Sequence, residues 1–206
     1  MDIICFPGAF SYEDGKERDY LKALEKYTYK TYIPIISFKT GKSEAITTVR
    51  ENVLSAVSKL LKNQLKFSEK ERMPLAYFLG ELTHNINEHS STSEGYVFAQ
   101  NYPNSNYLDL CICDDGQGIL QSYLTNPKFK PESEAVAIQL ALSGNSTKDR
   151  TEARGFGITT TRNMLVRDLR GKLFLWSGHT TFLQTLDKEA IVDIDGNGYF
   201  QGTFIH

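Results

Sequence analysis

Four short apolar runs near the C-terminus constrain the fold more than any other feature of this chain. They span residues 172–176, 180–186, 190–194 and 199–205, and only three or four residues separate each run from the next. Parallel neighbours in a sheet need a crossover of roughly a dozen residues or more, so such short connections favour antiparallel strands. We therefore expect an antiparallel sheet with tight turns, including a hairpin turn at residues 195–198.

Helical periodicity is confined to earlier parts of the chain. Apolar residues recur at helix spacing over 43–61, and a second helix is expected over about 70–89. Two strands should follow at 95–100 and 107–113, and a helix-prone stretch then reaches residue 142. Another helix is expected just after Gly157. Helices and strands in separate blocks predict the α+β class.

The N-terminal part has a different pattern of apolar and charged residues from the rest of the chain. Apolar runs at 3–6 and 32–38 flank a charged segment at 12–27, which could be helical. We interpret residues 1–42 as a strand–helix–strand extension that completes or flanks the main sheet, and residues 43–206 as the principal domain.

Composition excludes several classes of function. The 206-residue chain has a formal net charge of -2 and no long basic run, which argues against a general nucleic-acid or membrane-surface binder. It opens with no leader and contains no apolar stretch long enough to span a bilayer, so the cytoplasm is the expected location. Cys111 and Cys113 are interpreted as small core residues rather than zinc ligands, because no second pair accompanies them.

The expected helix at 75–89 separates its residues into two faces. One stripe is apolar and consists of Leu75, Phe78, Leu79, Leu82 and Ile86, whereas Glu81, His84, Asn85 and Glu88 fall on another face. A carboxylate and an amide one turn apart can share a magnesium ion and its water shell. The alternative is an ordinary solvated helix face.

Two glycine-containing segments follow. Residues 114–118 read Asp-Asp-Gly-Gln-Gly at the end of an expected strand, where a carboxylate could accept a hydrogen bond from an exocyclic amine and glycines could admit a flat base. Residues 154–157 read Arg-Gly-Phe-Gly before an expected helix, where backbone N–H groups favour phosphate. An Asp-Gly turn and a mobile loop are the respective alternatives.

Taken in order, these segments resemble the GHKL family of ATP-binding domains, which includes histidine kinases, anti-sigma kinases and gyrase B. Residues 81–89 resemble its N-box, 114–118 its G1 box and 154–157 its G2 box, and 202–204 are similar to the Gly-Thr pair near its last strand. Asp115 departs from the pattern, because the family often has Asn there. The resemblance covers about residues 72–205 and implies a two-layer sandwich with helices on one face of a mixed, mostly antiparallel sheet, the Bergerat fold.

The resemblance implies a role for each matching residue. Asn85 would ligate Mg²⁺, Asp114 would read the adenine amino group, and Gly116 and Gly118 would pass close to the base. Glu81 would be the general base that orients water or an acceptor hydroxyl. His89 is expected to pack or hydrogen-bond near the site. The other residues expected to bind the nucleotide are Lys148, Arg154, Gly155, Phe156 and Gly157.

Two functions are compatible with this resemblance. The chain could be an enzyme, either an ATPase or a protein-serine kinase similar to the anti-sigma kinases, which phosphorylate a STAS-type partner. It could instead be a non-catalytic switch in which bound nucleotide changes a protein-interaction surface. ATP and Mg²⁺ are the expected ligands in both cases, with a regulatory protein as partner and a homodimer as a further possibility.

Overall fold

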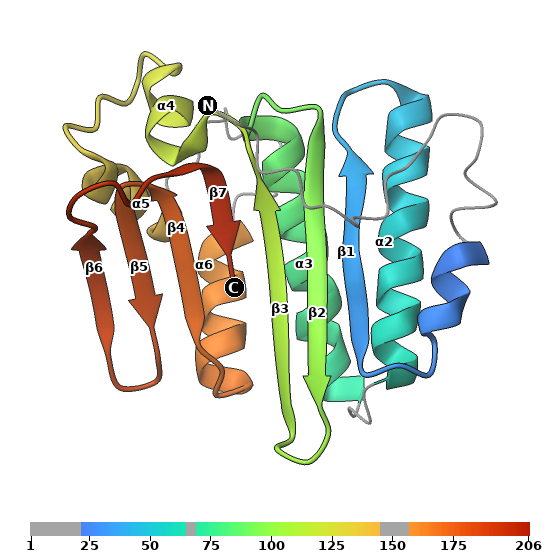
Figure 1. The fold of residues 1–206 in the computed structure, drawn as a ribbon. Helices are drawn as coiled ribbons and strands as arrows, with labels where there is room; N and C mark the ends of the chain where they lie inside the picture. Colours follow the sequence, from blue (N-terminus) through green and yellow to red (C-terminus); the bar gives the residue numbers. More distant parts are fainter. Residues whose placement is uncertain (1–21, 65–68, 145–156) are drawn as a thin grey trace.

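A seven-stranded sheet with helices on one face forms the described part of the chain (Figure 1). The computed structural model describes residues 22–64, 69–144 and 157–206. Strand order is β1-β2-β3-β7-β4-β5-β6. The strands are β1 (Tyr32–Lys39), β2 (Glu94–Tyr102), β3 (Tyr107–Asp114), β4 (Leu173–Gly178), β5 (Thr180–Gln184), β6 (Glu189–Asp193) and β7 (Phe200–Ile205).

The longest helices, α2 (Glu44–Gln64) and α3 (Glu69–His89), lie behind β1, β2 and β3 (Figure 1). The other elements are η1 (Glu25–Tyr27), α4 (Gly118–Leu124), α5 (Glu134–Leu142), α6 (Gly157–Asn163) and the π-helical turn η2 (Met164–Asp168) that continues α6. The α+β class and the two-layer arrangement are thereby confirmed. Among the described residues, no helix has a stretch long and apolar enough to cross a membrane.

All strand pairs in the described sheet are antiparallel, so the expected mixture of parallel and antiparallel pairs is not found there. Strand β1 pairs with β2 and forms one edge of the sheet, which makes residues 32–39 part of the main sheet. The apolar run at 3–6 lies outside the described residues.

The prediction of a hairpin turn at residues 195–198 is wrong, because β6 and β7 do not pair. Strand β6 is the other edge of the sheet and pairs with β5, whereas β7 lies between β3 and β4 (Figure 1). The connecting segment contains a turn with Gly196 at φ +78°, so its local turn chemistry is as expected. It crosses the ends of β4 and β5, and His179 holds it there through Ile194 N–H to His179 O at 2.6 Å and a ring nitrogen to Gly198 O at 2.9 Å.

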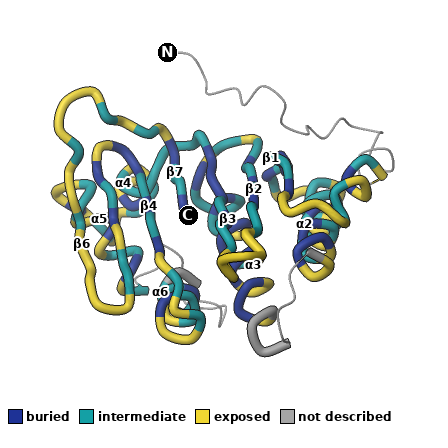
Figure 2. Tube along the Cα trace, turned by 60° about the horizontal axis from the view of Figure 1, so that its bottom comes forward, coloured by how far each residue is buried: buried dark blue, intermediate teal, exposed yellow. Residues whose placement is uncertain are grey.

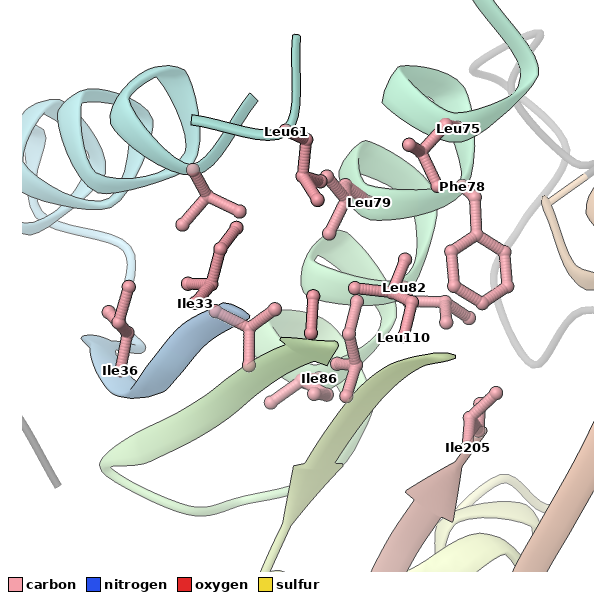
Figure 3. Close-up of a cluster of buried hydrophobic side chains, with 14 of the residues drawn as sticks. Ile33, Ile36, Leu61, Leu75, Phe78, Leu79, Leu82, Ile86, Leu110 and Ile205 are labelled. Atoms are coloured by element: carbon pink, nitrogen blue, oxygen red, sulfur yellow. The ribbon is translucent and has the colours of Figure 1, made fainter. Parts of the chain in front are cut away.

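The core lies between the helices and the sheet (Figure 3). The predicted apolar stripe of α3 is confirmed, because each of its members is at most 7% exposed: Leu75, Phe78, Leu79, Leu82 and Ile86. Strand β2 shows the matching period of two, with alternate residues buried against the helices. By contrast, edge strand β6 is exposed along nearly all its length (Figure 2).

Truncating the α3 stripe should destabilise the fold strongly. We expect Leu79→Ala to lower the free energy of unfolding by about 2–5 kcal/mol, because it removes buried methyl groups and leaves a cavity. Met73→Ala on the same helix is the control, since Met73 is 74% exposed and its loss should cost at most about 0.5 kcal/mol. Urea denaturation measures both, and equal effects would contradict the assigned helix face.

Candidate functional site

Asp114 ends β3 on the side of the sheet that faces the helices. Strand alternation places it on the same face as the buried Leu110 and Ile112, and it is only 3% exposed. Its Oδ1 accepts a hydrogen bond from Gly116 N–H at 2.9 Å, and the backbone of Thr203 in β7 supplies another. A carboxylate is therefore held away from solvent, with its orientation fixed by the main chain.

Burial raises the pKa of Asp114 to about 7. The neighbouring charge of Asp115 also raises this pKa, whereas the backbone hydrogen bonds from Gly116 and Thr203 lower it because they favour the ionised form. A group that titrates near neutrality can accept a hydrogen bond when ionised and donate one when protonated. Such perturbed carboxyl groups are concentrated at functional sites in proteins.

The loop after Asp114 is tied to the C-terminal end of α3. Gln117 donates twice to it, from its backbone N–H to Ser90 O at 2.7 Å and from its side-chain amide to His89 O at 2.6 Å. The hydroxyl of Thr92, just beyond the helix, donates to Asp115 Oδ1 at 2.6 Å. The end of β3 and the end of α3 therefore form a single polar junction.

The glycines of this loop are required by contacts within the protein. A Cβ at Gly116 would lie 2.0 Å from Ser90 O, and one at Gly118, where φ is +73°, would lie 2.9 Å from Ser177 Oγ. No side chain fits at Gly116, and Gly118 has a backbone conformation that favours glycine. Their expected proximity to a base stays a prediction, because the packing explains both glycines without a ligand.

Sequence reasoning missed Ser177, which joins three segments at this junction. Its hydroxyl accepts from Ile119 N–H at 3.0 Å and donates to Gly202 O at 2.8 Å. A Cβ at Gly202 would lie 2.1 Å from Asp114 O, which explains the glycine next to Thr203. The available signal was a serine at a core-facing position of β4, in phase with Leu173 and Leu175.

The proposed polar face of α3 is turned away from α2. Asn87 marks the α2 side, because its Oδ1 accepts from Gly41 N–H at 2.8 Å and from Arg50 of α2 at 2.6 Å. Asn85 precedes it by two residues, which is about 200° around the helix, and so faces the side where α6 lies (Figure 1). Glu81 is one turn earlier on this side, and both side chains are half-buried.

The first residue of α6 is Gly157, and this helix packs beside both α3 and α5. Thr159 donates from its hydroxyl to Leu142 O at 3.0 Å, which ties the start of α6 to the end of α5. Gly157 thus begins a helix on the side of α3 that carries Glu81 and Asn85. The other residues expected to contact phosphate lie outside the described residues: Lys148, Arg154, Gly155 and Phe156.

The predicted site residues of α3 lie at successive distances from the junction. His89 lies at the junction itself, Asn85 is one turn before it, and Glu81 is one turn further, at about 6 Å per four residues. The amide of Asn85 hydrogen-bonds to none of the residues that the structure describes.

Among the residues that the structure describes, no group of three or more His, Cys, Asp or Glu side chains could hold a metal ion. Of the two cysteines in β3, Cys113 is buried and Cys111 is partly buried.

Comparison of the chain with protein-family models, with curated proteins and with solved structures finds no match in any of the three. The resemblance to GHKL domains therefore rests on the short sequence motifs alone and stays a prediction.

The buried carboxyl of Asp114 should make stability depend on pH. Between the ordinary pKa near 4 and the folded value of about 7, the folded protein retains a proton that the unfolded chain has lost. The free energy of unfolding should therefore fall as pH rises through this window, by roughly 1.4 kcal/mol for each unit of pKa shift.

Urea denaturation at pH 5, 6, 7 and 8 checks this slope. Asp114→Asn keeps the size of the side chain and removes its titration, so the stability difference between wild type and variant isolates the contribution of Asp114. A difference that does not change between pH 5 and pH 7 would refute the raised pKa.

Proposed function

We propose that this chain binds Mg-ATP at the junction of β3 and α3 and acts as a cytoplasmic regulatory ATPase or protein-serine kinase of the GHKL type. One observation carries the proposal: the buried carboxyl of Asp114 is fixed beside the end of the helix that presents Glu81 and Asn85 towards α6. Asp114, Asn85 and Glu81 follow one another in the same order as the base, the metal ion and the γ-phosphate of Mg-ATP.

Asp114 has the chemistry of a base-reading residue. Buried acceptors discriminate strongly, because a ligand without the matching donor leaves them unpaired. The ionised carboxylate would accept a hydrogen bond from the exocyclic amino group of adenine. The Gly116 and Thr203 backbone groups keep its orientation fixed whether or not a ligand is bound.

Asn85 fits a Mg²⁺ site in which the protein supplies few ligands. Magnesium binds through one or two protein oxygens together with waters and phosphates, so a cluster of carboxylates is unnecessary. The Asn85 side-chain oxygen would supply such a ligand. When bound, the ion neutralises phosphate charge during transfer.

Glu81 lies one turn beyond Asn85, at the γ-phosphate end of this order. Its carboxylate would orient a water or an acceptor hydroxyl by accepting a hydrogen bond from it. A water would make the chain an ATPase, and a hydroxyl on a STAS-like partner would make it a protein-serine kinase.

A nucleotide-dependent interaction switch is the second candidate, and the opposite face of the sheet favours it. Phe174, Trp176, Phe200 and Phe204 form a half-buried aromatic cluster there, with ring centroids 5.5–6.2 Å apart. These side chains alternate with the residues that face the helices. None of the described helices covers this aromatic face, and such a face is suited to a protein partner.

Saturating Mg-ATP should stabilise the fold by roughly 2.7 kcal/mol at about 100 times its dissociation constant. Asn85→Ala should lose most of this gain and leave the apo protein nearly as stable as wild type, since Asn85 lies outside the apolar stripe. Asn87→Ala is the matched control: it should lower apo stability through lost contacts to Gly41 and Arg50 and keep the Mg-ATP gain. Thermal unfolding with and without Mg-ATP separates the two variants. An unfolded Asn85→Ala protein would show that the assigned face is wrong.

Glu81→Gln should lower turnover by about 10²–10⁴-fold with little change in the affinity for Mg-ATP, because an amide cannot act as general base. Incubation with γ-labelled ATP, alone and with candidate partners, measures this. Free phosphate identifies an ATPase and a labelled partner identifies a kinase. If ATP binds but neither product forms, the proposal of an enzyme fails and the interaction switch takes its place.

A further inference from the structure

The two edges of the sheet differ in how they are protected against further strand pairing. An edge strand carries backbone N–H and C=O groups without a partner in the sheet, and proteins usually block them. Strand β1 has Pro34 and an irregular register between Ile33 and Ile36, and all but one of its residues are at least partly buried. Strand β6 has no proline or glycine, and its register with β5 is regular. Of the two edges, β6 is therefore the one open to another strand (Figure 1).

The hydrogen bonds at both ends of β6 show which of its backbone groups face outwards. Thr185 N–H donates to Lys188 O at 2.8 Å, and Ile194 N–H donates to His179 O at 2.6 Å. Residues 188 and 194 therefore direct these groups towards β5. Along an antiparallel strand, residues that bond to one neighbour alternate with residues that face the other side. Three residues of β6 thus direct their N–H and C=O groups towards the free edge: Glu189, Ile191 and Asp193.

The side chains of β6 are also accessible to a partner. Four of its five residues are exposed, and Val192 is 55% exposed (Figure 2). Ala190 and Val192 lie on the face of the sheet that none of the described helices covers, beside the exposed Leu183 of β5. An added strand with apolar side chains at the matching positions would extend this apolar row.

The free edge is acidic at both of its ends. Residues 187–195 contain four acidic side chains and one lysine. At the start of β6, Glu189 pairs with Arg162 at 2.7 Å, whereas at its end Asp193 accepts a hydrogen bond from the neutral Thr180 at 2.6 Å. Opposite charges on facing strands stabilise their pairing. A strand with basic residues at its two ends therefore complements β6.

A second copy of β6 does not complement this edge. Antiparallel pairing of two copies about Ile191 would use all the outward backbone groups, but Glu189 of each copy would then lie opposite Asp193 of the other. Like charges directly opposite each other destabilise a strand pair. The charges thus disfavour self-pairing and favour a segment of opposite charge.

We propose that β6 is a docking edge for an extended segment of a partner protein, which adds to the seven-stranded sheet as a further antiparallel strand. The segment that fits has apolar residues between two basic ones, because its ends lie opposite Glu189 and Asp193. Its backbone bonds to these two residues and to Ile191. The docking edge is independent of nucleotide binding and identifies the kind of partner by its chemistry.

A peptide with the sequence Lys-Val-Ile-Val-Lys tests the docking edge, with amide hydrogen exchange of the labelled protein measured by NMR. At about 100 times its dissociation constant, the peptide should slow exchange at Glu189, Ile191 and Asp193 roughly a hundredfold, because only the free protein exchanges these amides. The amides of Ala190 and Val192 face β5 and should change much less.

Two N-methylated peptides are a matched control for backbone pairing. Methylation of the central isoleucine removes an N–H that faces β6 and should abolish binding. Methylation of a valine removes an N–H that faces away and should leave binding unchanged. For the charges, Asp193→Asn keeps the acceptor for Thr180 and should weaken binding by up to about fivefold. Glu-Val-Ile-Val-Glu should not bind.

Each contrary result overturns a stated part of the proposal. Unchanged exchange at the three outward amides would show that β6 accepts no strand. Equal binding of the two methylated peptides would exclude backbone pairing, and equal binding of the acidic peptide would exclude selection by charge. Protection of the same amides that grows with protein concentration, without peptide, would identify a second copy as the occupant instead.

Discussion

The junction between the end of β3 and the end of α3 is the constraint on which the rest of the structure depends. Main-chain groups approach one another so closely there that Gly116 and Gly202 leave no room for a side chain. Ser177 and Gln117 supply the hydrogen bonds that connect β4, β7 and α3 to the loop. Asp114 is buried because these segments converge around it, and its raised pKa follows from the same packing.

Helix α3 connects this junction to the rest of the fold because its three sides have different tasks. The apolar stripe packs into the core, and Asn87 fixes the helix to α2 and to the loop after β1. The remaining side carries Glu81 and Asn85 and faces α6. The scaffold thereby sets the position of the polar residues, and substitutions on the three sides should have separable effects.

Local patterns predicted the elements well, because apolar periodicity and turn residues act over a few positions. Such patterns predicted the apolar stripe of α3. They also predicted the two ends of β3 and the start of α6 to within one residue. The insertion of β7 between β3 and β4 did not follow, since the turn before it is compatible with a hairpin and only distant contacts to Asp114 and Leu175 decide the pairing. The same limit applies to Ser177, whose partners are far away in sequence. The sequence also could not show why position 116 is a glycine. A glycine required by protein packing and one required by a ligand are the same residue in a sequence.

The central claim is that Asp114, Asn85 and Glu81 belong to one nucleotide site. A backbone-amide NMR titration of the isotope-labelled protein with a non-hydrolysable Mg-ATP analogue tests it most directly. The account predicts that amide resonances of residues 81–90 and 114–119 shift together and saturate at a single affinity. Shifts confined to other parts of the sheet, or no saturable shift at all, would contradict it.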